Sequence, residues 1–322
     1  MLLSGIIQKI FKKELLVRHD PDGTIFYFSP EELGLSYTHF DFEGDRGQLL
    51  RGAFYQKNLT RPDTLIVFEH GMGCGHRAYM REIDLLCERG FLVFAYDHTG
   101  TLMSDGENIG GFSQSLADLD FALAALKESG YTEGRRVSVI GHSWGGFSTL
   151  NIAPLHPWLS SVVALSGFIS VNEMLISMLG KMKKYAPELL ALEAERFGSY
   201  AYADARFSLS AARDTRALII HSKDDPICPV SHFEKLAAAL SGCKNVELCA
   251  VDGKRHNPNF TRDAVLYKDD FFTEMTRRKK RGLLSSEGEK AAFISSYDWY
   301  KMTEQDPVLW EEIISFIESE KR

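Results

Sequence analysis

The segment Gly141-His142-Ser143-Trp144-Gly145 forms a G-x-S-x-G pattern directly after a predicted strand, Val137–Ile140. In this context the pattern is typical of a sharp strand-to-helix turn that holds a nucleophilic serine in a strained backbone conformation. Glycines two positions to either side are explained sterically, because side chains there would clash. We therefore predict that Ser143 is a nucleophile. The alternative is a glycine-rich turn that carries a surface serine.

A serine hydroxyl is a weak nucleophile at neutral pH, so it needs a histidine base whose tautomer is fixed by a carboxylate. In enzymes with this turn, the acid and then the histidine follow the serine along the chain. The loop after the predicted strand 217–221 offers Asp224 and Asp225, and the sequence Asp-Pro-Ile-Cys-Pro favours Asp225. Asp224 is then a surface or loop-capping residue. His256, in the loop after residues 246–251, is the predicted base.

Acyl transfer also needs hydrogen-bond donors for the oxyanion that forms on the substrate. We expect these donors to be the backbone N–H groups of Trp144, which follows the nucleophile, and of Met72 in the glycine-rich loop 70–75. Cys74 of that loop is a weaker candidate nucleophile, because the loop lacks the strand-to-helix turn. The loop matches neither a P-loop nor a dinucleotide-binding pattern. We therefore expect no metal and no organic cofactor.

Buried strands alternate with amphipathic helices along most of the chain. This alternation predicts an α/β fold with a mostly parallel central sheet and helices on both faces. The strands are expected at 24–28, 36–42, 48–56, 64–69, 91–97, 136–140, 159–166, 216–221 and 245–251. The helices are expected at 78–89, 114–128, 146–152, 232–240 and 307–318.

Two segments interrupt this alternation. Residues 171–215 are expected to be helical and to lie like a lid over the carboxyl edge of the sheet, where ligands bind in such folds. Residues 257–303 are expected to form an irregular insertion. The predicted organisation is a leading segment 1–35, a core 36–170, the lid, and a second part of the core, 216–322.

The lid carries Met174, Met178 and Met182 among other apolar residues. Methionine suits irregular pockets for flexible acyl chains, so these residues are candidate substrate contacts. The other interpretation is that the apolar stripe docks the lid on the core.

Residues 1–17 place their apolar side chains on one side of a predicted helix. This helix either packs on the body of the protein or lies peripherally on a membrane surface. No apolar stretch approaches the length of a membrane span, and the features of a secretory signal are missing. The five cysteines include no CxxC pair, which favours free thiols in the cytoplasm. The net charge of −7 argues against a nucleic-acid partner. The oligomeric state is not indicated.

Together these residues resemble the α/β-hydrolase superfamily, and within it the monoacylglycerol lipases, lysophospholipases and related esterases. Besides the Ser143 turn, the resemblance rests on His70-Gly71-Met72-Gly73, Tyr79, Gly90–His98 and Ser104-Asp105-Gly106. It implies an α/β-hydrolase fold with a lid over the site and a Ser143, Asp225 and His256 triad. It also implies a small-molecule ester substrate, with or without a long acyl chain.

Three alternatives remain open on the sequence. The same triad could cleave an amide or peptide, with acidic lid residues holding the amino terminus of a substrate; the candidates are Glu173, Glu188, Glu193 and Glu195. A lid that excludes water would favour acyl transfer. A hydrolase fold can also serve as a binding protein without turnover.

Overall fold

A sheet of eight strands forms the centre of the computed structural model, which describes residues 17–319 together with residues 5, 8, 9, 11 and 13. The strand order is β1-β4-β6-β5-β7-β8-β9-β10. Strands β5 to β10 run parallel, whereas β4 pairs antiparallel with both β1 and β6. The strand bounds are β1 Ser36–His39, β4 Gly52–Gln56, β5 Arg61–Glu69, β6 Phe91–Tyr96, β7 Arg136–His142, β8 Ser161–Leu165, β9 Arg216–Ser222 and β10 Val246–Val251, with β2 Phe42–Glu43 and β3 Leu49–Leu50 in a separate ribbon.

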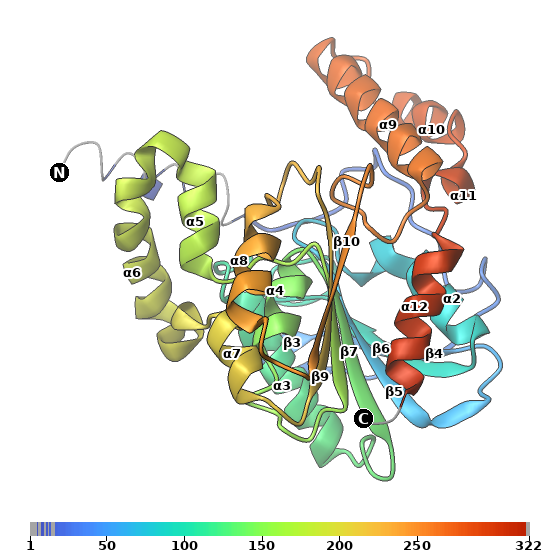
Figure 1. Ribbon diagram of the computed structural model, residues 1–322. Coiled ribbons are helices and arrows are strands. Elements are labelled where there is room, and N and C mark those ends of the chain that lie inside the picture. The colour runs from blue at the N-terminus through green and yellow to red at the C-terminus, as the bar shows by residue number, and fades with distance from the viewer. Residues whose placement is uncertain (1–4, 6–7, 10, 12, 14–16, 320–322) are drawn as a thin grey trace.

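Helices cover both faces of this sheet, as Figure 1 shows. One face carries α3 (Gln114–Glu128), α4 (Trp144–Asn151) and α8 (Ser231–Leu240), and the other carries α2 (Met80–Glu88) and α12 (Pro307–Glu318). The middle strands are apolar and buried along their length, as in β6, because they are covered on both sides. The predicted fold class is therefore confirmed.

The segment 24–28 is not a strand, contrary to expectation. Its aromatic residues pack against a helical unit near the C-terminus instead of joining the sheet. The ring of Phe26 lies 5.7 Å from that of Trp299, and the ring of Phe28 lies 4.7 Å from that of Tyr300. The aromatic content that suggested a strand thus serves side-chain packing.

The expectation that residues 257–303 are irregular is wrong. They form α9 (Arg262–Lys280), α10 (Glu287–Ser295) and α11 (Trp299–Met302). Side-chain caps begin these helices, and α10 has a full capping box between Ser286 and Glu289. We call residues 262–302 the C-terminal cap. It stands above one end of the sheet in Figure 1.

The cap is an insertion whose two connections run side by side. The Thr261 N–H donates to the Glu304 carbonyl at 2.9 Å, and the Asp306 N–H donates to the Asn259 carbonyl at 2.8 Å. The ammonium of Lys254 pairs with Asp306 at 2.6 Å. Phe271 and Phe293 form the centre of a small core inside the cap. The cap is thus held to the body by a short two-chain neck.

The segment 171–215 is helical, as expected, and lies between β8 and β9. It comprises α5 (Val171–Leu179), η2 (Gly180–Tyr185), α6 (Ala186–Phe197), η3 (Gly198–Tyr202) and α7 (Ala205–Ala211). In Figure 1 α5 and α6 lie beside the core, well away from the C-terminal cap.

Most of the predicted N-terminal helix, residues 1–17, lies outside the described residues. Phe11 is described and is buried, with its ring 6.2 Å from that of Phe112. Within the described residues, every helix is too short or too polar to cross a bilayer.

Candidate active site

Ser143 lies at the tip of a tight turn between β7 and α4. Its φ of 57° and ψ of −111° place it in a backbone region that residues with a side chain rarely adopt. The flanking glycines are required by close packing. A Cβ on Gly141 would lie 2.2 Å from the Gly145 carbonyl oxygen, and one on Gly145 would lie 2.4 Å from the Glu69 carbonyl oxygen. The sequence pattern thus places a half-buried hydroxyl on a rigid turn at the cavity wall.

The structure brings Ser143, His256 and Asp225 together. The Ser143 hydroxyl lies 2.8 Å from Nε2 of His256. On the other side of the ring, Nδ1 of His256 lies 2.8 Å and 3.0 Å from the two carboxylate oxygens of Asp225. If the Nδ1–H donates to Asp225, Nε2 is free to accept the serine proton.

Asp225 is held by its own loop. Its Oδ1 accepts the N–H groups of Ile227 and Cys228 at 2.8 and 2.9 Å. Burial raises its pKa, but the hydrogen bonds from His256 and these amides outweigh burial and lower it below the ordinary value. Asp225 therefore stays ionised at neutral pH.

The neighbouring Asp224 has a different role. Its Oδ1 accepts the Ser222 hydroxyl at 2.6 Å and the N–H groups of Lys254 and Arg255 at 3.2 Å each. These bonds join the loop after β9 to the loop that carries His256. Asp224 is therefore a loop-capping residue that lies beside the triad.

A chain of hydrogen bonds links the glycine-rich loop, the nucleophile turn and the His256 loop. The Gly71 N–H donates to the Tyr79 hydroxyl at 3.0 Å. The His256 carbonyl can only accept, so Nε2–H of His142 donates to it at 2.7 Å. Nδ1 of the neutral His142 ring then accepts the Tyr79 hydroxyl at 2.8 Å. Burial, followed by the nearby His256, lowers the pKa of His142 to about 3. His142 is therefore neutral, and its tautomer is fixed.

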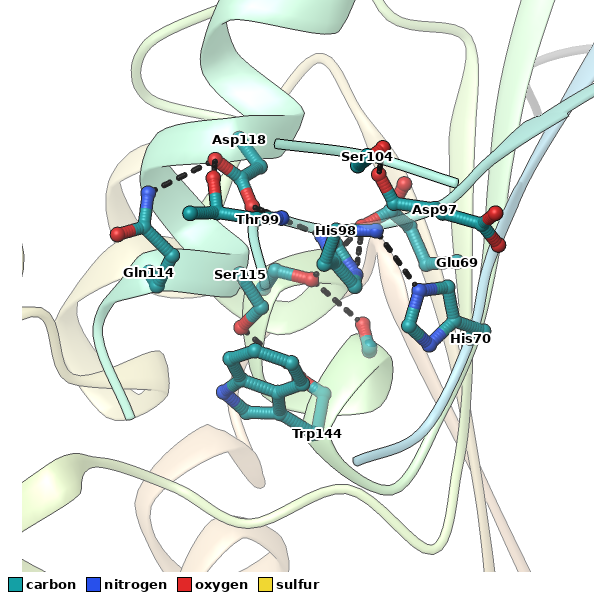
Figure 2. A network of polar contacts seen from close by, with 12 residues as sticks. Glu69, His70, Asp97, His98, Thr99, Ser104, Gln114, Ser115, Asp118 and Trp144 are labelled. Carbon is teal, nitrogen blue, oxygen red and sulfur yellow. Dashed lines mark hydrogen bonds and ion pairs between the residues drawn. The ribbon is translucent and has the colours of Figure 1, made fainter. Parts of the chain in front are cut away.

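A buried polar network lies behind the glycine-rich loop, and Figure 2 shows His98 at its centre. The two ring nitrogens of His98 lie 3.3 Å from carboxylate oxygens of Glu69 and Asp118. Burial alone would lower the pKa of His98, but the two carboxylates raise it. The backbone N–H of His98 donates to Nε2 of the His70 ring at 2.9 Å. Nδ1–H of the His70 ring donates to the Gly71 carbonyl at 2.7 Å. The network thereby fixes the backbone next to Met72.

Trp144 is anchored from the same side. Its indole N–H donates to the Phe112 carbonyl at 2.6 Å, and its carbonyl accepts the Ser115 hydroxyl at 3.2 Å. The His98 ring lies 4.9 Å from the indole ring. The two residues predicted to donate to an oxyanion, Met72 and Trp144, are therefore both held by buried contacts around the nucleophile.

A cavity of about 460 Å³ opens beside Ser143 and His256. Its volume is within the usual range for small-molecule sites. The walls are mainly apolar; they include Ile25, Phe26 and Phe260, together with Val265, Phe271 and Trp299 of the C-terminal cap. Met72 also lines the cavity. The sequence analysis missed this wall because it treated residues 257–303 as irregular.

The expected substrate contacts of Met174, Met178 and Met182 are not found. No residue of 171–215, all of which the structure describes, lines the cavity. Met174 packs into the main core, whereas Met178 and Met182 are exposed. The physical reason is the position of α6, which buried Glu193 holds against the start of α3.

Glu193 makes that attachment through three hydrogen bonds. Its carboxylate accepts the N–H groups of Phe112 and Ser113 at 2.9 and 3.0 Å, and the Ser113 hydroxyl at 2.9 Å. Carboxylates are favourable at helix N-termini. The 171–215 segment is therefore docked beside the site instead of over it.

Two other possibilities can be judged on geometry. Burial raises the pKa of Cys74 to about 11, so this thiol is protonated at neutral pH and a poor nucleophile. Within the described residues, no group of three or more His, Cys, Asp and Glu side chains is arranged to hold a metal ion.

The known proteins that match this chain are hydrolases of several kinds. Residues 60–206 match the family model described as serine aminopeptidase, S33. The monoglyceride lipase homologue of Monkeypox virus is 24% identical over 163 residues, which are 46% of this chain and 58% of that relative. The bis(hydroxyethyl) terephthalate hydrolase of Streptomyces coelicolor is 35% identical over 81 residues, a quarter of each chain. The chain thus spans at most about three fifths of these curated relatives.

The solved structure of the Pyrococcus furiosus esterase Pf2001 superposes with a TM-score of 0.59 at 19% identity. The match covers 83% of this chain and 98% of the esterase. The chain therefore has the α/β-hydrolase fold. It is similar in structure to this esterase and in sequence to the monoglyceride lipase homologue.

Proposed function

We propose that this protein is a serine hydrolase that cleaves carboxylic esters with Ser143, His256 and Asp225. The observation that carries the proposal is the continuous contact from the Ser143 hydroxyl through the His256 ring to the Asp225 carboxylate, at the mouth of an apolar cavity. An apolar cavity suits an acyl chain.

The reaction follows from this geometry. His256 takes the Ser143 proton as the hydroxyl attacks the acyl carbon, and the N–H groups of Met72 and Trp144 stabilise the oxyanion. His256 then gives the proton to the alcohol as the ester bond breaks. The acyl group stays bound to Ser143. Water that loses its proton to His256 attacks the acyl-serine and releases the acid. Asp225 keeps the imidazole in the required tautomer throughout.

The test is hydrolysis of a p-nitrophenyl ester series from acetate to palmitate by the full chain. We expect turnover that Ser143→Ala abolishes, together with labelling of Ser143 by a fluorophosphonate in the wild type alone. A folded protein that neither hydrolyses any ester nor reacts with the label would refute the proposal and favour a binding role.

Peptide or amide hydrolysis is the second candidate, because the matching family model is described as a serine aminopeptidase. An aminopeptidase needs free carboxylates near the nucleophile to hold a substrate amine. Glu193 is bound to α3, and Glu173 pairs with Lys235 at 2.7 Å. These engagements favour the ester proposal. Aminoacyl p-nitroanilides, assayed beside the esters, distinguish the two.

A further inference from the structure

Lys268 of α9 is a charged side chain in the mainly apolar wall of the active-site cavity. It is half-buried and lines the same cavity as Ser143 and His256. Its surroundings include the Phe260 ring, whose centroid lies 4.9 Å from the ammonium nitrogen. The proposed ester hydrolysis makes no use of this ammonium.

The ammonium has few partners. It donates one hydrogen bond, to Oδ1 of Asn257 at 3.1 Å, although an ammonium has three N–H donors. In the described part of the chain, no carboxylate oxygen lies within ion-pair distance of it; the Lys268 ammonium is absent from the ion pairs that join other lysines to Asp and Glu. Two donors are therefore available to a molecule in the cavity.

The nearest carboxylates make no ion pair with Lys268. Asp269 pairs with Arg255 at 2.7 Å. Oε1 of Glu82 accepts the Asn259 amide at 3.1 Å, and its buried Oε2 has no hydrogen-bond partner. Burial raises the pKa of Glu82. Burial lowers the pKa of Lys268, and the nearby Glu82, Cys74 and Asp269 offset part of that shift.

A half-buried cation without an ion-pair partner is costly, and a bound anion would remove part of that cost. We propose that Lys268 is a specificity residue that binds an anionic group, carboxylate or phosphate, on the ester substrate. This inference rests on the proposed function and narrows its substrate class. The substrate would combine an apolar portion, in contact with the aromatic cap residues, and one negative charge that reaches Lys268.

The experiment measures charge selectivity in wild type and variants. The first arm compares p-nitrophenyl hemiesters of dicarboxylic acids with p-nitrophenyl alkanoates of matched length, which places the charge on the acyl side. The second arm compares a 1-acylglycerol 3-phosphate with the same 1-acylglycerol, which places it on the alcohol side. Each arm gives a ratio of kcat/KM for the charged over the neutral substrate.

We expect Lys268→Met to lower the ratio about 10- to 100-fold in the arm that has the anion on the correct side, since charge-assisted hydrogen bonds are the strong ones. Turnover of the neutral substrate, measured beside it, shows that the variant is folded. Lys268→Arg should restore most of the ratio. Lys280→Met, on the exposed end of the same helix, is the matched control and should leave both ratios unchanged.

The outcomes separate the two proposals. If neutral esters are turned over but Lys268→Met changes neither ratio, the anion subsite is refuted and the ester hydrolase stands. If the wild type turns over no ester, neutral or charged, the proposed function itself is refuted. If Lys268→Met lowers the kcat/KM ratio in one arm alone, the result supports the inference and identifies the side of the ester that carries the charge.

Discussion

Substitution of Tyr79 by phenylalanine tests whether the hydrogen-bond chain across the site matters. The Tyr79 hydroxyl accepts the Gly71 N–H and donates to Nδ1 of His142, and all these groups are buried. Phenylalanine keeps the ring and removes both bonds. One donor and one acceptor then stay buried without a partner, and each such group costs about 1–3 kcal/mol. We expect a loss of about 3 kcal/mol in the free energy of unfolding.

The activity should fall as well. Without Tyr79, the backbone next to Met72 loses a contact, and His142 no longer has a fixed tautomer with which to hold the His256 carbonyl. We expect kcat to drop about tenfold with a smaller change in KM, because oxyanion donors act mainly in the transition state.

The assay is urea unfolding at pH 7, with ester turnover measured on the same samples. Tyr202→Phe is the matched control, because Tyr202 is 64% exposed and its substitution should leave both quantities unchanged. An unfolding free energy for Tyr79→Phe within 0.5 kcal/mol of wild type, at an equal slope in urea, would show that the chain contributes nothing and that the reasoning is wrong.

Three further predictions follow from single contacts. Asp225→Asn should lower kcat about 10⁴-fold with an unchanged circular dichroism spectrum, because the imidazole tautomer is lost; a loss under tenfold would contradict the assigned role. Gly145→Ala should lower Tm by several degrees or prevent folding, since its Cβ would lie 2.4 Å from a carbonyl oxygen, whereas Gly242→Ala, with nothing within 4 Å, should not. Burial raises the pKa of Asp97, but its bonds to His76 outweigh this and lower the pKa to about 2. The folded pKa is below the unfolded one, so this stability is present above pH 4 and is lost as pH falls toward 2. Asp97→Asn should therefore remove about 1 kcal/mol of the stability that wild type loses between pH 5 and pH 3, measured by urea unfolding.

The central sheet was predictable because its pattern is local. Strand β6 is a run of apolar residues between turn signals, and helix α3 has an apolar stripe whose bounds, Gln114–Glu128, agree with the prediction. The nucleophile turn was also predictable, since a G-x-S-x-G segment after a strand has few structural solutions. Likewise, the order of elements brought Asp225 and His256 to the same sheet edge as Ser143, because carboxyl ends of parallel strands meet there.

The cap was not predictable from pattern alone. Helix α9 buries only Ala264, Val265 and Phe271 and is otherwise polar, so it shows no broad apolar stripe. Its position over the site depends on contacts between distant segments, such as Phe26 with Trp299 and Asp22 with Lys279 at 2.5 Å. The capping box at Ser286 and Glu289 was a local signal for α10 that could have been found.

The predicted position of the 171–215 segment was wrong for a related reason. An insertion after β8 can fold over the sheet edge or beside it, and contacts with distant parts of the chain, such as those of buried Glu193, hold it beside the site. Glu193 lies on α6 but its partners lie at the start of α3, about 80 residues earlier, so no local pattern links them.

Residues that line the cavity come from inside and outside the range matched by the family model, and this bears on substrate choice. The family model matches residues 60–206, which contain Ser143 but neither Asp225, His256 nor the C-terminal cap. That match therefore includes Ser143 and the glycine-rich loop, whereas the aromatic residues of the C-terminal cap that line the cavity lie outside it. The aromatic cap residues and Lys268 line the cavity beside Ser143. Substrate preference should consequently respond to substitutions in α9, and substitutions in α5 or α6 should leave it unchanged.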